Sequence, residues 1–200
     1  MNDKVIDWLY GVIAKPVPTL NEIAREKPVG WALTIYLGVS ALAMVASLYS
    51  GGSHGSMEYI MSEFNFHLSK AVLIAGVIMF SLLTVFIFTG LAHLFARLFG
   101  GRAGYWNLFS AYAFAGFPVI INVPILFVMS FLGVVGGVLG GLLSFGISVW
   151  IIILQVVAIR ESHAISTGAS IGVYVISVFI LVVVAVAISA AFVYSVFMAI

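Results

Sequence analysis

The sequence lacks cysteine and has very little charge. None of its 200 residues is cysteine, and 8 Lys+Arg with 7 Asp+Glu make up only 8% of the chain. The absence of thiols excludes disulfide frameworks, thiolate metal sites, iron–sulfur clusters and cysteine nucleophiles. So few charges cannot cover the surface of a water-soluble domain, in which about a quarter of the residues are charged. The net charge of +1 gives no electrostatic footprint for nucleic acid.

The chain is instead rich in long apolar runs. Hydrophobic residues make up 64% of it and the mean hydropathy is +1.25, which is typical of an integral membrane protein. A helix that crosses the bilayer needs about 20 residues. The uncharged run 103–159 must fold back once, because it is too long for one span and too short for three. The runs predict an all-α membrane bundle of five transmembrane helices, near Trp31–Tyr49, Ala71–Ala96, Leu108–Leu132, Val138–Ile159 and Ile171–Met198.

The first 29 residues differ from the rest, so we expect an interfacial segment at 1–29 and a five-span domain at 30–200. Lys15 and two prolines interrupt the apolar stretch, which excludes a signal peptide. The spacing predicts a short amphipathic helix lying in the membrane surface, with Val5, Ile6, Trp8, Leu9, Val12 and Ile13 on its apolar side. Thr19 and Glu22 form a capping-box pattern that predicts a second short helix, ended by Pro28. The alternative is a flexible tail.

The distribution of Lys and Arg predicts the orientation. With five spans, one side of the membrane carries Lys4, Lys15, Arg25, Lys27, Arg97, Arg102 and Arg160, and the other carries only Lys70. Positively charged loops stay on the cytoplasmic side. We therefore expect a cytoplasmic N terminus and an outer C terminus, in the inner membrane if the source is bacterial.

Glycines mark two predicted turns. Gly100 and Gly101 lie where the chain reverses between the second and third spans, and a cluster around Gly133 and Gly136–Gly137 predicts the turn between the third and fourth. Gly133, Gly137 and Gly141 also repeat every four residues, with a second row at 136 and 140, which favours close helix packing. The partner of that glycine face is either another helix of the chain or a second copy.

The third span contains Pro118 and Pro124, which predict a kink. His93, Asn122 and Gln155 are the deepest polar side chains of spans two, three and four. They form either one ligand or ion pathway or separate hydrogen bonds that hold the bundle together.

Two pairs of metal-binding side chains lie in the outer loop. His54 with Glu58, and Glu63 with His67, are each four residues apart, so each pair shares a helix face. The two pairs do not share one face, because Glu58 and Glu63 lie about 140° apart round a helix. A solvated loop is the competing interpretation, and we expect no metal site and no cofactor.

No motif supports catalysis: the chain has no phosphate-binding glycine loop, no His-Glu-x-x-His and no acidic residue within a predicted span. Two functional classes follow. The first is a non-enzymatic scaffold or accessory factor that binds membrane proteins and lipid, and that forms a homo-oligomer if the glycine face pairs with itself. The alternative is a small permease or channel that uses the kinked third span.

Three stretches resemble a known family: residues 15–23, residues 93–118 and residues 150–169. They contain, in order, the pre-membrane elbow KPVPTLNEI, the segment HLFARLFGGR followed by SAYAFAGFP, and the run from Trp150 through HAISTGA. Their order and spacing are similar to those of the five-span YIP-domain proteins, named for interaction with Ypt/Rab small GTPases. The resemblance implies the same five-span topology. It does not imply GTPase binding or vesicle traffic, because the long cytosolic N-terminal region of the eukaryotic members is absent from this sequence.

Overall fold

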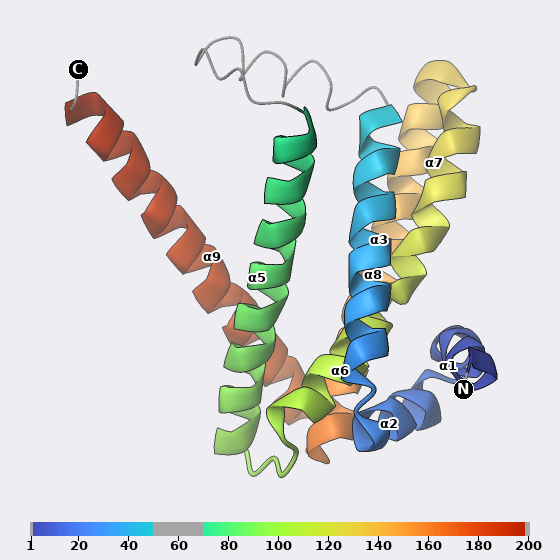
Figure 1. Cartoon of the computed structure of the whole chain (residues 1–200), viewed down its shortest axis with the longest axis vertical. Coiled ribbons are helices and arrows are strands. Elements are labelled where there is room, and N and C mark those ends of the chain that lie inside the picture. Colours follow the sequence, from blue (N-terminus) through green and yellow to red (C-terminus); the bar gives the residue numbers. More distant parts are fainter. Residues whose placement is uncertain (1, 50–69, 199–200) are drawn as a thin grey trace.

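The computed structural model describes residues 2–49 and 70–198, and in these ranges every regular element is a helix. The elements are α1 (Asn2–Ala14), α2 (Pro16–Glu26), α3 (Val29–Tyr49), α5 (Lys70–Leu98), α6 (Tyr105–Ala115), the 3-10 helix η1 (Phe117–Ile121), α7 (Asn122–Ser130), α8 (Gly133–His163) and α9 (Thr167–Met198). The helices α3, α5, α7 and α8 run roughly along the long axis, α9 runs obliquely to them, and α1, α2 and α6 lie at one end (Figure 1). We call this end, with the loops 99–104 and 164–166, the base.

Four stretches of the described chain are long and apolar enough to cross a membrane: Ala75–Leu98, Tyr105–Ser130, Gly133–His163 and Thr167–Ala191. They correspond to the second to fifth predicted spans, so the all-helical architecture with several apolar helices is confirmed. The first predicted span coincides with α3, whose described apolar part, Val29–Met44, is shorter. The count of five therefore stays a prediction.

The third span is divided rather than simply bent. The prediction is one kinked helix over 108–132, whereas the structure has α6, then η1, then α7. Pro118 lies in the first turn of η1 and Pro124 in the first turn of α7. First-turn N–H groups have no acceptor within their own helix, so a proline there loses no hydrogen bond. The two prolines thus divide the span at the two helix starts.

The turn between the third and fourth spans lies earlier than predicted. The chain turns at Phe131 and Leu132, and α8 already begins at Gly133, whose φ of +56° is in the left-handed region. One glycine with positive φ is enough to redirect the chain. Gly136 and Gly137 are therefore helical, which corrects the prediction that they form the turn.

Glycines of α8 let it pack closely on α7. Gly136 and Gly140 are buried, and a Cβ on Gly136 would overlap the carbonyl oxygen of Met129. The row Gly133, Gly137 and Gly141 has no atom within 4 Å of an added Cβ. The second row, rather than the first, thus provides the contact with α7.

The start of α2 also corrects the sequence prediction. The helix begins at Pro16, because a proline at the first helical position needs no N–H partner and already has a helical φ. Thr19 is consequently inside α2, and its hydroxyl donates to the Lys15 carbonyl at 2.8 Å. Glu22 does not reach back to form a capping box and instead pairs with Lys4 of α1 at 3.4 Å.

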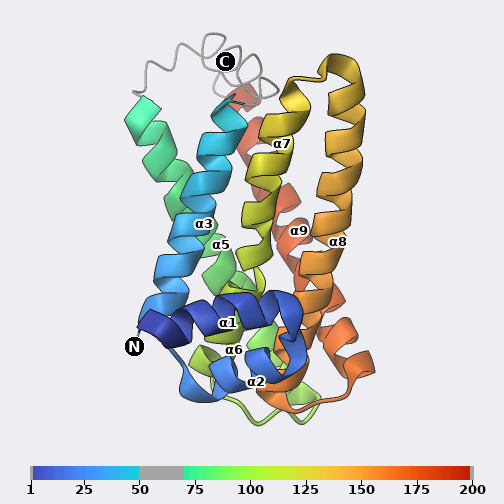
Figure 2. The same ribbon diagram turned by 90° about the vertical axis from the view of Figure 1, so that its right-hand side faces the viewer.

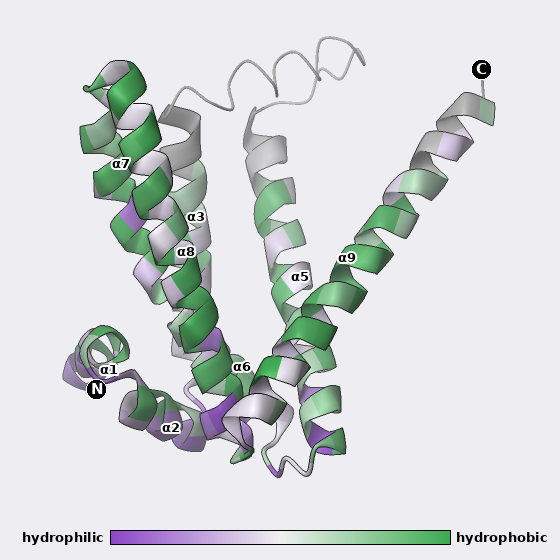
Figure 3. Cartoon of the chain, turned by 180° about the vertical axis from the view of Figure 1, so that it is seen from behind, coloured by the Kyte–Doolittle hydropathy of each residue, from purple (hydrophilic) through white to green (hydrophobic). Residues whose placement is uncertain are grey.

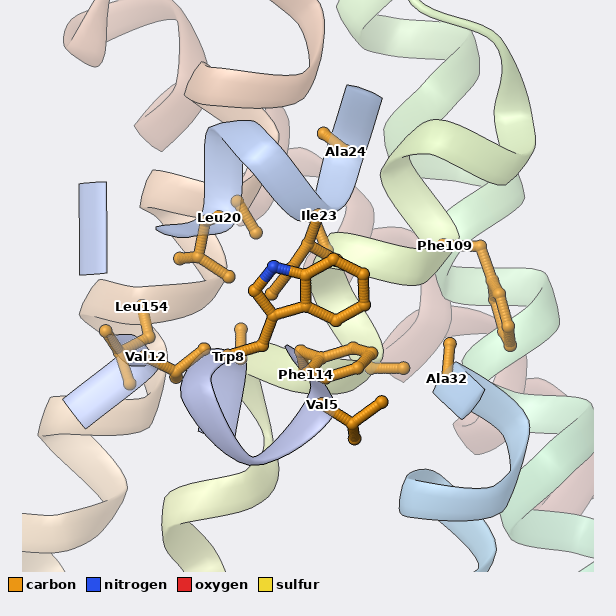
Figure 4. Close-up of a cluster of buried hydrophobic side chains, with 14 of the residues drawn as sticks. Val5, Trp8, Val12, Leu20, Ile23, Ala24, Ala32, Phe109, Phe114 and Leu154 are labelled. Atoms are coloured by element: carbon orange, nitrogen blue, oxygen red, sulfur yellow. The ribbon is translucent and has the colours of Figure 1, made fainter. Parts of the chain in front are cut away.

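The buried core lies in the base, around α6. Phe109 and Phe114 of α6 are fully buried, as are Leu20 and Ile23 of α2. Trp8 of α1 meets the Phe114 ring edge-on, with the ring centroids 5.8 Å apart (Figure 4). Burial of each of these large side chains contributes about 2 kcal/mol, so α1 and α2 are firmly attached to the bundle.

One apolar face of α1 is inside the protein, which corrects the prediction that its whole apolar set meets the membrane. Val5, Trp8 and Val12 are buried, whereas Ile6 and Ile13 are 64% and 40% exposed. Both sets repeat at helical spacing, so the sequence periodicity alone does not show which set faces the protein core and which faces outward.

Candidate functional site in the base

Two histidines from distant parts of the chain meet in the base. His163 is the last residue of α8 and is 1% exposed, and His93 lies one turn before Arg97 in α5. The Nδ1 atom of His93 and the Nε2 atom of His163 are 3.4 Å apart, and the ring centroids are 5.2 Å apart. The separation is that of a weak hydrogen bond, in which one ring donates and the other accepts. The pair joins the C-terminal part of α5 to the C-terminal end of α8.

Gly101 packs directly against this histidine pair. A Cβ at Gly101 would lie 2.5 Å from Nδ1 of His163 and 2.7 Å from the Ala96 carbonyl oxygen. Gly100 is different, because an added Cβ there meets open space but its φ is +87°. Gly100 therefore supplies backbone conformation, and Gly101 supplies room for an imidazole.

Backbone hydrogen bonds connect the two loops of the base. The Arg102 N–H donates to the His163 carbonyl at 3.4 Å, and the Gly101 N–H donates to the Ala96 carbonyl at 2.8 Å. In the second loop, the Ser166 hydroxyl accepts from the Ala169 N–H at 3.2 Å and caps the start of α9. These bonds attach the loop 99–104 to the ends of α5 and α8, and the loop 164–166 to the start of α9.

Side-chain amides attach α2 to this assembly. The Asn21 side chain donates to a carboxylate oxygen of Glu161 at 3.1 Å, and the same carboxylate pairs with Arg160 at 2.8 Å. The Asn107 side chain of α6 donates to the Ala24 carbonyl at the end of α2, at 2.8 Å. The elbow before the first span is therefore bound to both α6 and α8.

The three predicted polar-core residues lie in separate surroundings. His93 meets His163, and Gln155 accepts a hydrogen bond from the Tyr174 hydroxyl at 3.1 Å. The side-chain oxygen of Asn122 is buried and has no hydrogen-bond partner within the described ranges. No hydrogen bond among the described residues joins any two of the three.

Sequence reasoning missed a hydroxyl cluster between α3 and α5. The Tyr36 hydroxyl donates to the Ser81 carbonyl at 3.0 Å and lies 2.9 Å from the Ser81 hydroxyl, which is 3.3 Å from that of Ser40. The available signal was the four-residue spacing of Tyr36 and Ser40 in an otherwise apolar run. His163 was likewise missed as a partner of His93, because nothing local in the sequence joins residues 70 positions apart.

The candidate zinc ligands at positions 54, 58, 63 and 67 lie outside the described residues. Within the described ranges, no three His, Cys, Asp or Glu residues gather closely enough to hold a metal ion.

Comparison with known families identifies the domain. The family model of the Yip1 domain matches residues 10–189, which is most of the chain. The chain belongs to the Yip1 domain family. No curated protein and no solved structure matches the sequence. With its apolar helices, this Yip1 domain is a multi-pass integral membrane protein.

The stretches that carry the Yip1 resemblance are brought together in the base. Residues 15–23 contain most of α2, residues 93–118 run from His93 through the glycine turn and α6, and residues 150–169 include His163 and the cap of α9. These stretches contact one another through the His93–His163 pair and the Asn21–Glu161 hydrogen bond. The Yip1 motifs thus describe one spatial unit.

Proposed function

We propose that this Yip1 domain protein is a non-enzymatic scaffold or accessory factor of the membrane, and that its base binds other membrane proteins. The supporting observation is how the base uses its polar groups. Several polar side chains form hydrogen bonds between elements of the base. The bonds join His93 to His163, Asn21 to Glu161, and Asn107 to the Ala24 carbonyl. The outer side of α2 instead exposes charged side chains, including Arg25. A rigid support with an exposed polar face suits recognition of a protein partner.

We place the base on the cytoplasmic side, at the inner ends of five spans. Seven of the 8 Lys and Arg residues lie in or next to the base, and hydrophilic residues gather there (Figure 3). The positive-inside preference supports this orientation. The start of α1 lies in the base and the end of α9 at the opposite end (Figure 1), which agrees with an odd number of spans.

Within residues 1–29, we propose that α1 lies in the lipid interface beside the bundle. It runs crosswise to the long helices (Figure 2). At about 100° per residue, Ile6, Tyr10 and Ile13 lie about 130° round the helix from the face buried in the protein. These three side chains are 64%, 72% and 40% exposed. Lys4 contacts Glu22 and Glu26 of α2, so the exposed apolar stripe lies on the side turned away from α2.

A site-specific photo-crosslinker tests the scaffold proposal. Placed at Arg25 in the full chain and activated in native membranes, it should give reproducible adducts with defined membrane proteins. The matched control is Val175 of α9, which is 56% exposed on an apolar helix and should yield mainly lipid adducts. Identical patterns from Arg25 and Val175 would contradict the proposal.

The described structure offers no observation that favours a permease or channel. The break in the third span, on which that alternative depends, packs against α3 and α8. A break in a transmembrane helix that is covered by protein needs no water-filled pathway. Self-association through the open row Gly133, Gly137 and Gly141 stays a prediction.

A further inference from the structure

Arginine, aliphatic and aromatic side chains are exposed around the turn that joins α5 to α6. Arg97 and Arg102 flank the glycine turn and are exposed. Leu98 is 74% exposed and Phe99 51% exposed, and Trp106, in the first turn of α6, is 47% exposed. Apolar side chains beside cationic groups suit the boundary between lipid tails and headgroups.

Within the described ranges, Arg97 and Arg102 have no acidic partner. No ion pair involving Arg97 or Arg102 occurs among the residues that the structure describes, where the carboxylates in ion pairs are Glu22, Glu26 and Glu161. The remaining described acids, at positions 3 and 7, belong to α1, which Figure 1 places on the other side of the base from this turn. The positive charge of the turn is therefore not neutralised within the described chain.

The segment that carries these side chains is held in shape. Besides the bonds of Gly101 and Arg102 described above, the Gly100 N–H donates to the Arg97 carbonyl at 3.1 Å. The Trp106 ring packs edge-on against Phe86 of α5, with the centroids 6.4 Å apart. A surface that is ordered before binding loses little conformational entropy when a ligand arrives.

We infer that Arg97 and Arg102, with Leu98, Phe99 and Trp106, form a binding surface for the phosphate headgroup of an anionic phospholipid. The arginines pair with the phosphate, and the apolar side chains contact the first part of the acyl chains. The inference requires that this end of the bundle lies at a headgroup layer. It does not depend on the protein-binding role proposed above, because it concerns lipid alone.

Native mass spectrometry of the purified full chain in mild detergent tests the inference. Phosphatidylglycerol and phosphatidylcholine with identical acyl chains are titrated separately. The wild type should bind phosphatidylglycerol more tightly than phosphatidylcholine. Because each cation near an anionic lipid contributes about a fivefold change in affinity, Arg97→Gln/Arg102→Gln should weaken phosphatidylglycerol binding about 30-fold and leave phosphatidylcholine binding nearly unchanged.

The control variant is Lys15→Gln/Lys27→Gln, which removes the same charge from either end of α2 and should weaken binding only severalfold. Equal losses in the two variants, or no preference of the wild type for phosphatidylglycerol, would overturn the inference. If the arginine variant does not fold, Arg97→Lys/Arg102→Lys and a salt titration of the wild type replace it. Affinity for phosphatidylglycerol that is unchanged between about 0.05 and 0.5 M salt would also overturn the inference, because exposed charge pairs are screened in this range.

Discussion

Replacement of Gly101 by alanine tests the packing on which the base depends. The added Cβ would lie 2.5 Å from Nδ1 of His163 and 2.7 Å from the carbonyl oxygen of Ala96. The second of these atoms belongs to the backbone of α5, so a side-chain rotation cannot relieve both overlaps. The loop that carries residue 101 must therefore move away from the end of α5.

The expected cost follows from the contacts that such a movement breaks. Overpacking of a well-packed site costs about 1–3 kcal/mol. Displacement of the loop also weakens the Arg102 to His163 backbone hydrogen bond, which contributes about 0.5–1.5 kcal/mol. We therefore expect Gly101→Ala to lower the free energy of unfolding by about 2–4 kcal/mol, equivalent to about 5–15 °C in Tm for a chain of this size.

Thermal unfolding in mild detergent, followed by tryptophan fluorescence, measures this loss. The matched control is Gly137→Ala, because Gly137 is helical and an added Cβ there meets nothing within 4 Å. That variant should gain about 0.5–1 kcal/mol from helix propensity. His163→Ala combined with Gly101→Ala should show a coupling of at least about 0.5 kcal/mol, since removal of the imidazole relieves one overlap. A Gly101→Ala protein as stable as the wild type would refute the described packing.

Three further predictions concern other contacts. Trp8→Ala removes a buried indole from the core of the base, so we expect a loss of about 3–5 kcal/mol and faster tryptic cleavage between α1 and α2. Gly136→Ala should lower Tm, because the added methyl overlaps the Met129 carbonyl. The hydrogen bond to Glu26 raises the pKa of Lys4, so its stabilising contribution is complete below the unfolded value and is lost as pH rises through the folded value. Glu26→Gln should lower that pKa in an NMR titration of the lysine side chain.

Much of the transmembrane architecture could be predicted because it follows from local physics. A helix in lipid satisfies its backbone hydrogen bonds within its own segment, so the length of an apolar run is enough to locate it. The second to fifth predicted spans match long apolar helices, and the two prolines lie where the third span is divided. The turn between the third and fourth spans was predicted around Gly133 and Gly136–Gly137 but lies just before Gly133. The sequence could not place it exactly, because a cluster of glycines does not show which one adopts a positive φ.

The candidate site was less predictable, because its contacts join residues far apart in the sequence. His93 was a candidate, but its partner His163 lies 70 positions away. The Gly133 row was selected for its spacing, which the row at 136 and 140 shares, and only the position of α7 distinguishes the two.

The sequence by itself determined that this chain is a helical membrane protein, where most of its spans lie and which end gathers positive charge, because hydrophobic length and charge act on each segment separately. Only the tertiary structure decided which face of α1 enters the core, which glycine faces an imidazole and which cations form ion pairs with the described carboxylates. These outcomes depend on how separate segments approach one another, and that information belongs to no single stretch of the chain.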